Sequence, residues 1–423
     1  MNQNISPDSL AILLLCSNIG LNSLKSKEIN YKSFSDKEWI KLSHRIVRSE
    51  VRRPSALFEL NEIGIREYLQ IPLSTAKRIR YLLDRTGSLT LELEKLGNMG
   101  IWVITRADSV YPKSFKKILK LDSPTILYGA GKIELLNDRG VGIVGSRDVD
   151  EQGAVFTDIL ARRCAKEKLT VISGGSKGVD LIAQNAALEE GGNVVAVLSD
   201  SLAKTVKKKE ILAHILKGNL LLISAYHPNS RFYSYSALGR NKHIYGLSKY
   251  TVVSSSTAGK GGTWSGAIEN LEAKWVPLFV RDETGVPDGN IELIKKGGIG
   301  IGTKELEETE SLETLLQTRV TEYFSSDEEI NVPHEKRTKL NEPLDLFNVV
   351  WPYIESLLNK PRSIKELSME FNIEESQMDI WIKTAYSKGK IKYVNETKII
   401  STVFFNKEEH QDRQISIFET PVD

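Results

Sequence analysis

Three glycine-containing loops hold the residues most able to do chemistry, because each loop follows an apolar segment and carries one cationic side chain. Their residues are Gly145, Ser146 and Arg147; Ser173, Gly174, Gly175, Ser176, Lys177 and Gly178; and Lys260, Gly261, Gly262 and Thr263. Glycine lets backbone N–H groups approach a ligand closely, and the N-terminus of a helix that follows attracts anions. One such loop indicates only a turn, whereas three loops that each carry a cation predict phosphate binding.

A fourth candidate element precedes an apolar segment and consists of Arg240, Asn241 and Lys242. Two cations that flank an amide can hold a phosphate and touch the edge of a base, although two solvated surface cations explain the pattern equally well. Three aromatic residues lie just before this element, at Phe232, Tyr233 and Tyr235. If exposed, they would stack on the bases of a single strand, but burial in the core is the simpler explanation for each of them.

The elements that position these loops lie between about residues 101 and 302, where short β-branched segments alternate with amphipathic helical patterns. This alternation predicts an α/β fold with right-handed crossovers and a doubly wound, mostly parallel sheet. The expected strands are 101–105, 141–144, 170–172, 193–198, 220–223, 250–253 and 275–280. Loops after parallel strands share the carboxyl edge of the sheet, where such folds bind ligands. We therefore expect the loops to converge on one edge.

The sequence patterns outside residues 98–302 differ from those of the α/β segment. Residues 1–97 show apolar residues at helical spacing, which predicts a helical domain ahead of the α/β domain at 98–302. Residues 303–342 are polar and rich in glutamate, and we interpret them as an acidic linker. Residues 343–405 combine helical patterns with a β-hairpin, which favours a winged-helix-like domain, and residues 406–423 form a tail.

Composition narrows the class of protein. A chain of 423 residues with 40% hydrophobic and 26% charged residues is expected to hold two to four globular domains and not to be disordered throughout. With 57 Lys and Arg against 55 Asp and Glu, any affinity for nucleic acid must come from local clustering of cations. No apolar segment is long enough to span a membrane and no basic leader precedes the first apolar segment, so a cytoplasmic protein is the default expectation.

Several kinds of site are not expected. Two cysteines cannot build a disulfide framework or a thiolate zinc site, and the six histidines show no spacing typical of metal ligands. No G-x-x-x-x-G-K-[ST] motif is present, which argues against a P-loop ATPase, and no G-x-G-x-x-G motif follows strand 141–144, which argues against dinucleotide binding. We expect no metal and no cofactor.

Taken together, the motifs resemble the DprA/Smf family of DNA-processing proteins over roughly residues 100–300, about half of the chain. The matching segments are Tyr111-Pro112, Asp122-Ser123-Pro124, 143–147, 173–180, Ala187-Leu188, Gly191-Gly192, 240–242 and 246–248. The resemblance implies an extended Rossmann-like domain that binds single-stranded DNA, self-association as a homodimer, no catalytic residue, and loading of the RecA recombinase during natural transformation. A preceding domain of SAM or helix-hairpin-helix type and a following winged-helix-like domain also fit architectures of that family.

The resemblance assigns individual residues. Ser146 and Arg147 match the family's Ser-Arg after the first strand of the domain, and residues 240–242 match its Arg-Asn-Arg/Lys element. Lys177 replaces the usual Arg, so the charge is kept but the forked geometry is lost. Asp180 matches the family's Asp. Because a carboxylate would repel a phosphate, we expect Asp180 to accept hydrogen bonds from loop amides at a helix N-terminus.

The chain departs from the family pattern at three places. Ser224-Ala225 replaces Ser-Glu, Ser254-Ser255-Ser256 stands where an acidic residue is common, and 260–264 replaces a Ser-Gly-Ser/Thr loop. These changes remove negative charge from the expected ligand edge, which favours a polyanion. They also leave open a specialised branch of the family with another task, such as phage defence.

Two alternative functions remain open. The Gly261-Gly262-Thr263 loop with Arg240 and Glu269 resembles LOG-type phosphoribohydrolases, which act on a nucleoside monophosphate, although Glu269 falls farther past the loop than that pattern requires. An exposed helix position is the simpler explanation for Glu269. Alternatively, the 343–405 domain could bind duplex DNA, but the mixed charge of its helix 375–387 favours contact with a protein.

Overall fold

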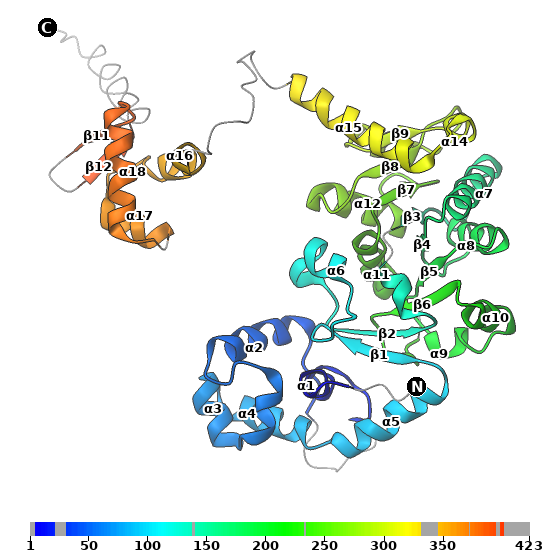
Figure 1. The fold of residues 1–423 in the computed structure, drawn as a ribbon, viewed down its shortest axis with the longest axis horizontal. Coiled ribbons are helices and arrows are strands. Elements are labelled where there is room, and N and C mark those ends of the chain that lie inside the picture. Colours follow the sequence, from blue (N-terminus) through cyan, green and yellow to red (C-terminus); the bar gives the residue numbers. More distant parts are fainter. Residues whose placement is uncertain are drawn as a thin grey trace, which may run out of the picture. The chain divides into compact units, whose positions relative to one another are not determined.

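The computed structural model describes residues 5–21, 31–137, 140–231, 234–330, 346–371, 373–394 and 398–401 (Figure 1). The chain divides into two compact units, residues 1–331 and residues 332–423. Within the described ranges, no helix has both the length and the apolar character that crossing a membrane requires.

A nine-stranded sheet in the order β1-β2-β6-β5-β4-β3-β7-β8-β9 forms the centre of the first unit. The strands are β1 (Trp102–Thr105), β2 (Ile126–Ala130), β3 (Val141–Val144), β4 (Val171–Ser173), β5 (Val194–Val197), β6 (Leu220–Ser224), β7 (Tyr250–Val253), β8 (Leu278–Arg281) and β9 (Ile299–Ile301). Strands β3 to β9 pair in parallel, and β1 and β2 join the sheet antiparallel. The predicted α/β fold with a mostly parallel sheet is confirmed, and β2 and β9 were not predicted.

Helices cover both faces of this sheet, as a doubly wound fold requires (Figure 1). One face packs against α7 (Glu151–Lys166) and α8 (Val179–Glu189), and the other against α11 (Ser234–Leu247) and α12 (Gly261–Ala273). The strands are buried on both faces, which explains their unbroken apolar sequences. The smaller helices of this region are α6 (Lys113–Ile118), η3 (Lys120–Asp122), η4 (Ile133–Leu136), α9 (Leu202–Thr205), α10 (Lys209–Lys217) and α13 (Asp288–Lys295).

The N-terminal region is helical, as predicted, but its core is continuous with the sheet. Its helices are α1 (Pro7–Cys16), α2 (Asp36–Arg48), η2 (Pro54–Glu59), α3 (Glu62–Leu69), α4 (Leu73–Leu83) and α5 (Thr86–Asn98). The hydroxyl of Ser9 on α1 lies 2.9 Å from that of Thr105 on β1 and donates to Asp108 at 2.7 Å. The boundary predicted at residue 97 therefore does not separate two compact units.

The predicted acidic linker at 303–342 is wrong for its first part. Residues up to 330 form α14 (Thr303–Glu308) and α15 (Leu312–Ile330), in which Leu306, Leu312 and Leu316 are buried. The carboxylate of Glu167, the residue directly after α7, accepts a hydrogen bond from the Leu312 backbone N–H at 2.8 Å and so satisfies the start of α15. The rest of the predicted linker, 331–342, lies outside the described residues.

The second unit has its own small core, which includes Trp351, Ile382 and Ile391. It contains α16 (Leu346–Leu357), β10 (Arg362–Ser363), α17 (Ile364–Phe371), α18 (Glu375–Ser387), β11 (Ile391–Tyr393) and β12 (Lys398–Ser401), with the strands antiparallel in the order β10-β12-β11. The predicted hairpin is confirmed by the pairing of β11 with β12. The winged-helix assignment stays a prediction, and the predicted tail 406–423 lies outside the described residues.

Candidate nucleic-acid interface

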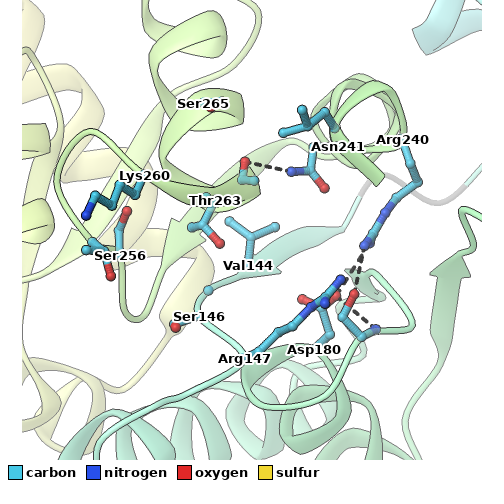
Figure 2. Close-up of a pocket in the computed structure, with 16 residues that line it drawn as sticks. Val144, Ser146, Arg147, Asp180, Arg240, Asn241, Ser256, Lys260, Thr263 and Ser265 are labelled. Carbon is cyan, nitrogen blue, oxygen red and sulfur yellow. Dashed lines mark hydrogen bonds and ion pairs between the residues drawn. The ribbon is translucent and has the colours of Figure 1, made fainter. Parts of the chain in front are cut away.

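A cleft of about 640 Å³ opens at the carboxyl ends of β3 and β7 (Figure 2). The chain proceeds from β3 to β4, β5 and β6 on one side and then returns to β7 on the other side of β3. Open α/β sheets bind ligands where the strand order reverses in this way. The cleft is lined by Val144, Gly145, Ser146, Arg147, Ser176, Asp180, Leu238, Arg240, Asn241, Ser256, Thr257, Lys260, Gly261, Gly262, Thr263 and Ser265.

The structure therefore brings residues of all three predicted loops to one edge of the sheet. A second cleft of about 350 Å³ lies beside the first and shares Arg147 and Ser176 with it. Lys177 and Gly175 line this second cleft, together with Lys208 and Asp200. Arg147, Lys177 and Lys260 are exposed. We call these three cations, which line the two clefts, the cationic rim.

Glycine serves different purposes in the three loops. A Cβ at Gly145 would collide with the Val179 side chain, and one at Gly174 would collide with the Arg240 guanidinium and the Asp180 carboxylate. Gly178 has a φ of +78° and abuts the Ser146 backbone. The first two loops thus need glycine to pack against their neighbours. In the third loop, Gly261 has a φ of +85° and no atom within 4 Å of the position of a Cβ, so it shapes a turn and leaves open space.

Arg240 has an acidic partner. Its side chain is buried, with Nη1 3.5 Å from Asp180 Oδ2 and Nη2 donating to the Ser176 hydroxyl at 3.2 Å (Figure 2). Asp180 also accepts the Ser176 backbone N–H at 3.2 Å, which confirms its predicted structural role. Burial raises the pKa of the Asp180 carboxyl, while the Arg240 guanidinium opposes the rise. Arg240 was predicted to hold phosphate, but this ion pair uses its charge to hold the second loop.

The neighbours of Arg240 on α11 have different environments. Asn241 Nδ2 donates to the Gly262 carbonyl at 2.8 Å, so this amide ties α11 to the third loop. Lys242 lines neither cleft, because successive helix residues point about 100° apart. Desolvation raises the pKa of the Glu269 carboxyl, and the charge of Lys242 opposes the rise. Ser173 is also turned away from a ligand role, since its hydroxyl donates to the Ile143 carbonyl at 2.6 Å.

Two features of the cleft escaped sequence reasoning. Ser256 lines the cleft, its backbone N–H donates to Asn290 Oδ1 at 2.8 Å, and no described residue offers a partner to its buried hydroxyl. In the sequence, residues 254–256 are distinctive only because they lack an acidic residue. No sequence pattern predicted that Asn290 would contact them. In addition, no side chain in the described part of the chain caps the N-terminus of α12, whose first residues line the cleft. An uncapped helix N-terminus favours an anion.

Comparison with known proteins finds relatives of the part of the chain that contains this site. Residues 102–306 match the family of DNA recombination-mediator protein A. Over this segment the chain is similar to the DprA/Smf family. It is 29% identical over 222 residues to the DNA processing protein DprA of Streptococcus pneumoniae, which covers 52% of this chain and 75% of that protein. It is 26% identical over 210 residues to DprA of Bacillus subtilis, covering 49% and 70% of the two chains.

One solved structure supports the fold, and a second is similar over part of the chain. The X-ray structure of S. pneumoniae DprA superimposes with a TM-score of 0.50 at 22% identity, and covers 66% of this chain and 99% of that chain. The structure of DNA processing protein A from Helicobacter pylori, described for its single-stranded DNA binding mode, gives a TM-score of 0.43 at 28% identity and covers 53% and 97%.

Some of the candidate residues do not line either cleft. Glu269, proposed for an alternative phosphoribohydrolase activity, is exposed on α12 and does not line either cleft. Of the aromatic residues weighed for base stacking, Phe232 and Tyr233 lie outside the described residues, and so does the side chain of Tyr235.

Proposed function

We propose that this protein is a non-catalytic recombination mediator that binds single-stranded DNA at the cationic rim and hands it to a RecA-type recombinase, acting as a homodimer. The observation that carries the proposal is the convergence of Arg147, Lys177 and Lys260 at the strand-order reversal of the sheet. The match of residues 102–306 to the family of DNA recombination-mediator protein A supports DNA as the polyanion.

The charges of the clefts suit a phosphate backbone. Among the described residues, Asp180 is the one carboxylate that lines the first cleft, and its ion pair with Arg240 reduces its repulsion of an anion. The uncapped N-terminus of α12 adds partial positive charge on the side of Lys260. Since Arg147 borders both clefts, a strand could pass from one to the other. Contacts to phosphates carry no sequence information, so we expect affinity that is nearly independent of base sequence.

The arrangement gives weaker support to nucleotide hydrolysis. That chemistry would need Glu269 beside an available Arg240, whereas Glu269 lines neither cleft and Arg240 is paired with Asp180. Incubation with nucleoside monophosphates, followed by chromatography for free base, tests this alternative directly. Release of base by the wild-type chain, abolished in Glu269→Gln, would overturn the non-catalytic proposal.

The binding site is tested with the variant Arg147→Ala/Lys177→Ala/Lys260→Ala. Fluorescence anisotropy with a single-stranded oligonucleotide across a salt series should show weaker binding to every sequence and a log–log salt slope smaller in magnitude by about 2, because each lost phosphate contact contributes about 0.7. A matched control replaces the exposed residues Lys132, Lys217 and Lys296, which line neither cleft. Wild-type affinity and slope in the rim variant would show that the site is assigned incorrectly.

The handover is tested by the rate at which RecA assembles on single-stranded DNA in the presence of each variant. The wild-type protein and the control should accelerate assembly, and the rim variant should not. Acceleration by the rim variant equal to that of the wild type would separate RecA loading from DNA binding and contradict the proposed mechanism.

A further inference from the structure

Helix α2 presents a line of basic residues on its solvent face, and none of them lines either cleft. Lys37, Lys41, His44 and Arg48 follow one another at spacings of three or four residues, and all four are exposed. The opposite face buries Trp39, Leu42 and Ile46 in the core. With a rise of about 1.5 Å per residue, the eleven intervals from Lys37 to Arg48 extend about 16 Å. We call these four residues the α2 stripe.

The acidic residues of α2 do not neutralise the stripe, because both have other partners. Asp36 accepts a hydrogen bond from the Thr125 hydroxyl at 2.6 Å, and Glu38 pairs with Arg78 at 2.6 Å. The Arg78 contact helps to lower the pKa of Glu38 to about 2, so this carboxylate stays ionised within its pair. Among the described residues, no carboxylate forms an ion pair with Lys37, Lys41 or Arg48.

Further cations follow the stripe along the chain. Arg52 and Arg53 come four and five residues after Arg48, and both are exposed. Glu50 is the one acidic residue between Arg48 and Arg53. The C-terminal end of α2 and the segment after it therefore carry a clear excess of positive charge in a chain whose net charge is only +2.

Helix α6 lies between α2 and α11, the helix of Arg240 (Figure 1). Its Phe115 packs against His243 of α11, with 5.6 Å between ring centroids. The chain that follows α6 reaches α2 through the hydrogen bond between Thr125 and Asp36. Four lysines of α6 and the turn after it are exposed, at Lys113, Lys116, Lys117 and Lys120. Positive charge is thus present on the element that connects the helix of Arg240 with α2.

We propose that the α2 stripe binds the sugar–phosphate backbone of the DNA strand where it extends beyond the clefts; this rests on the proposed function of the cationic rim. A length of about 16 Å faces about five phosphates of one stacked strand at roughly 3.4 Å each. The exposed face of α2 offers cations without an exposed aromatic side chain, so it suits phosphates and not bases. The stripe would lengthen the footprint of the protein on DNA and add to its salt dependence.

The test compares two oligonucleotides in the full-length chain. The variant Lys37→Gln/Lys41→Gln/Arg48→Gln alters exposed side chains only, and Lys132→Gln/Lys217→Gln/Lys296→Gln is its matched control. Anisotropy is measured across a salt series with a strand of about 40 nucleotides and one of about six, the shorter near the lower end of single-strand site sizes. For the long strand, the stripe variant should lower the magnitude of the salt slope by about 2, and the control should not. For the short strand, the stripe variant and the control should both have the affinity and the salt slope of the wild type.

The outcomes separate the two proposals. A stripe variant with wild-type affinity and slope on the long strand, while the rim variant binds weakly, would overturn the role of α2 and leave the rim intact. That result would also be expected if the stripe instead contacts an acidic protein. Wild-type binding of both oligonucleotides by the rim variant would overturn the proposed function itself. Circular dichroism of each variant checks that the helices are retained.

Discussion

The ion pair of Arg240 and Asp180 leads to a prediction that separates positioning from direct DNA contact. The two side chains are almost fully buried, with 3.5 Å between Nη1 and Oδ2. At an effective dielectric constant of about 20, this separation corresponds to roughly 5 kcal/mol of Coulomb attraction before the cost of desolvation is subtracted. Removing one partner of such a pair leaves the other charge buried, which typically costs about 3–5 kcal/mol.

We therefore expect Arg240→Met to lower the free energy of unfolding by about 3 kcal/mol in urea denaturation. Asp180→Asn keeps an acceptor for the Ser176 N–H, and the double variant should recover about half of the loss, because no charge is then buried alone. The affinity for single-stranded DNA should fall in Arg240→Met as the second loop loosens. The salt slope should stay within error of the wild type, because Arg240 is not expected to neutralise a phosphate.

The comparison with Arg147→Ala makes this reasoning refutable. Arg147 is exposed at the junction of the clefts, so its loss should reduce the magnitude of the slope by about 0.7 with little change in stability. If Arg240→Met instead lost about 0.7 of slope and kept its stability, Arg240 would contact phosphate directly, and the positioning role argued from the ion pair would be incorrect.

Two further predictions concern stability. Gly174→Ala should destabilise the chain by roughly 1–3 kcal/mol, since the added Cβ meets Arg240 and Asp180. The control Gly97→Ala on α5 adds a Cβ in open space and should be neutral or stabilising by up to about 1 kcal/mol. Equal midpoints of urea denaturation for the two variants would refute the packing argument. The Arg78 contact lowers the pKa of Glu38 from 4.5 to about 2, so its stabilisation is present above about pH 4.5 and lost as the pH falls towards 2. The free energy of unfolding of the wild type should therefore exceed that of Glu38→Gln by at most about 1 kcal/mol at pH 7, because solvent exposure weakens the contact. The two free energies should become equal as the pH falls towards 2. A difference that stays constant over this pH range would contradict the role of the Arg78 contact.

Sequence reasoning was most successful where burial leaves a strong pattern. The strands expected at 141–144 and 250–253 form the centre of the sheet because apolar residues buried on both faces stay consecutive in sequence. The glycines and the cation that follow each of three strands predicted that the cationic rim lies at one edge of the sheet. The acidic segment after residue 303 misled because its glutamates are the exposed side of helices whose leucines, such as Leu306 and Leu316, are buried.

Long-range pairing could not be predicted in the same way. Arg240 and Asp180 are 60 residues apart, and nothing in either local segment shows that the fold brings them together. The same holds for Asn290 and Ser256, which are 34 residues apart. Lys242 was assigned with its neighbours because they are adjacent in sequence, but on a helix adjacent residues point in different directions, and only two of the three line the first cleft.

Two consecutive residues of α11 fasten the loops on either side of the first cleft. Arg240 holds Ser176 after β4, and Asn241 holds Gly262 at the start of α12. Because both loops are bonded to the same helix, a small tilt of α11 would widen or narrow the cleft. The cations of the rim would stay in place on their loops. Variation on the buried side of α11 could thus retune which polyanion fits, with no change in a residue that touches it.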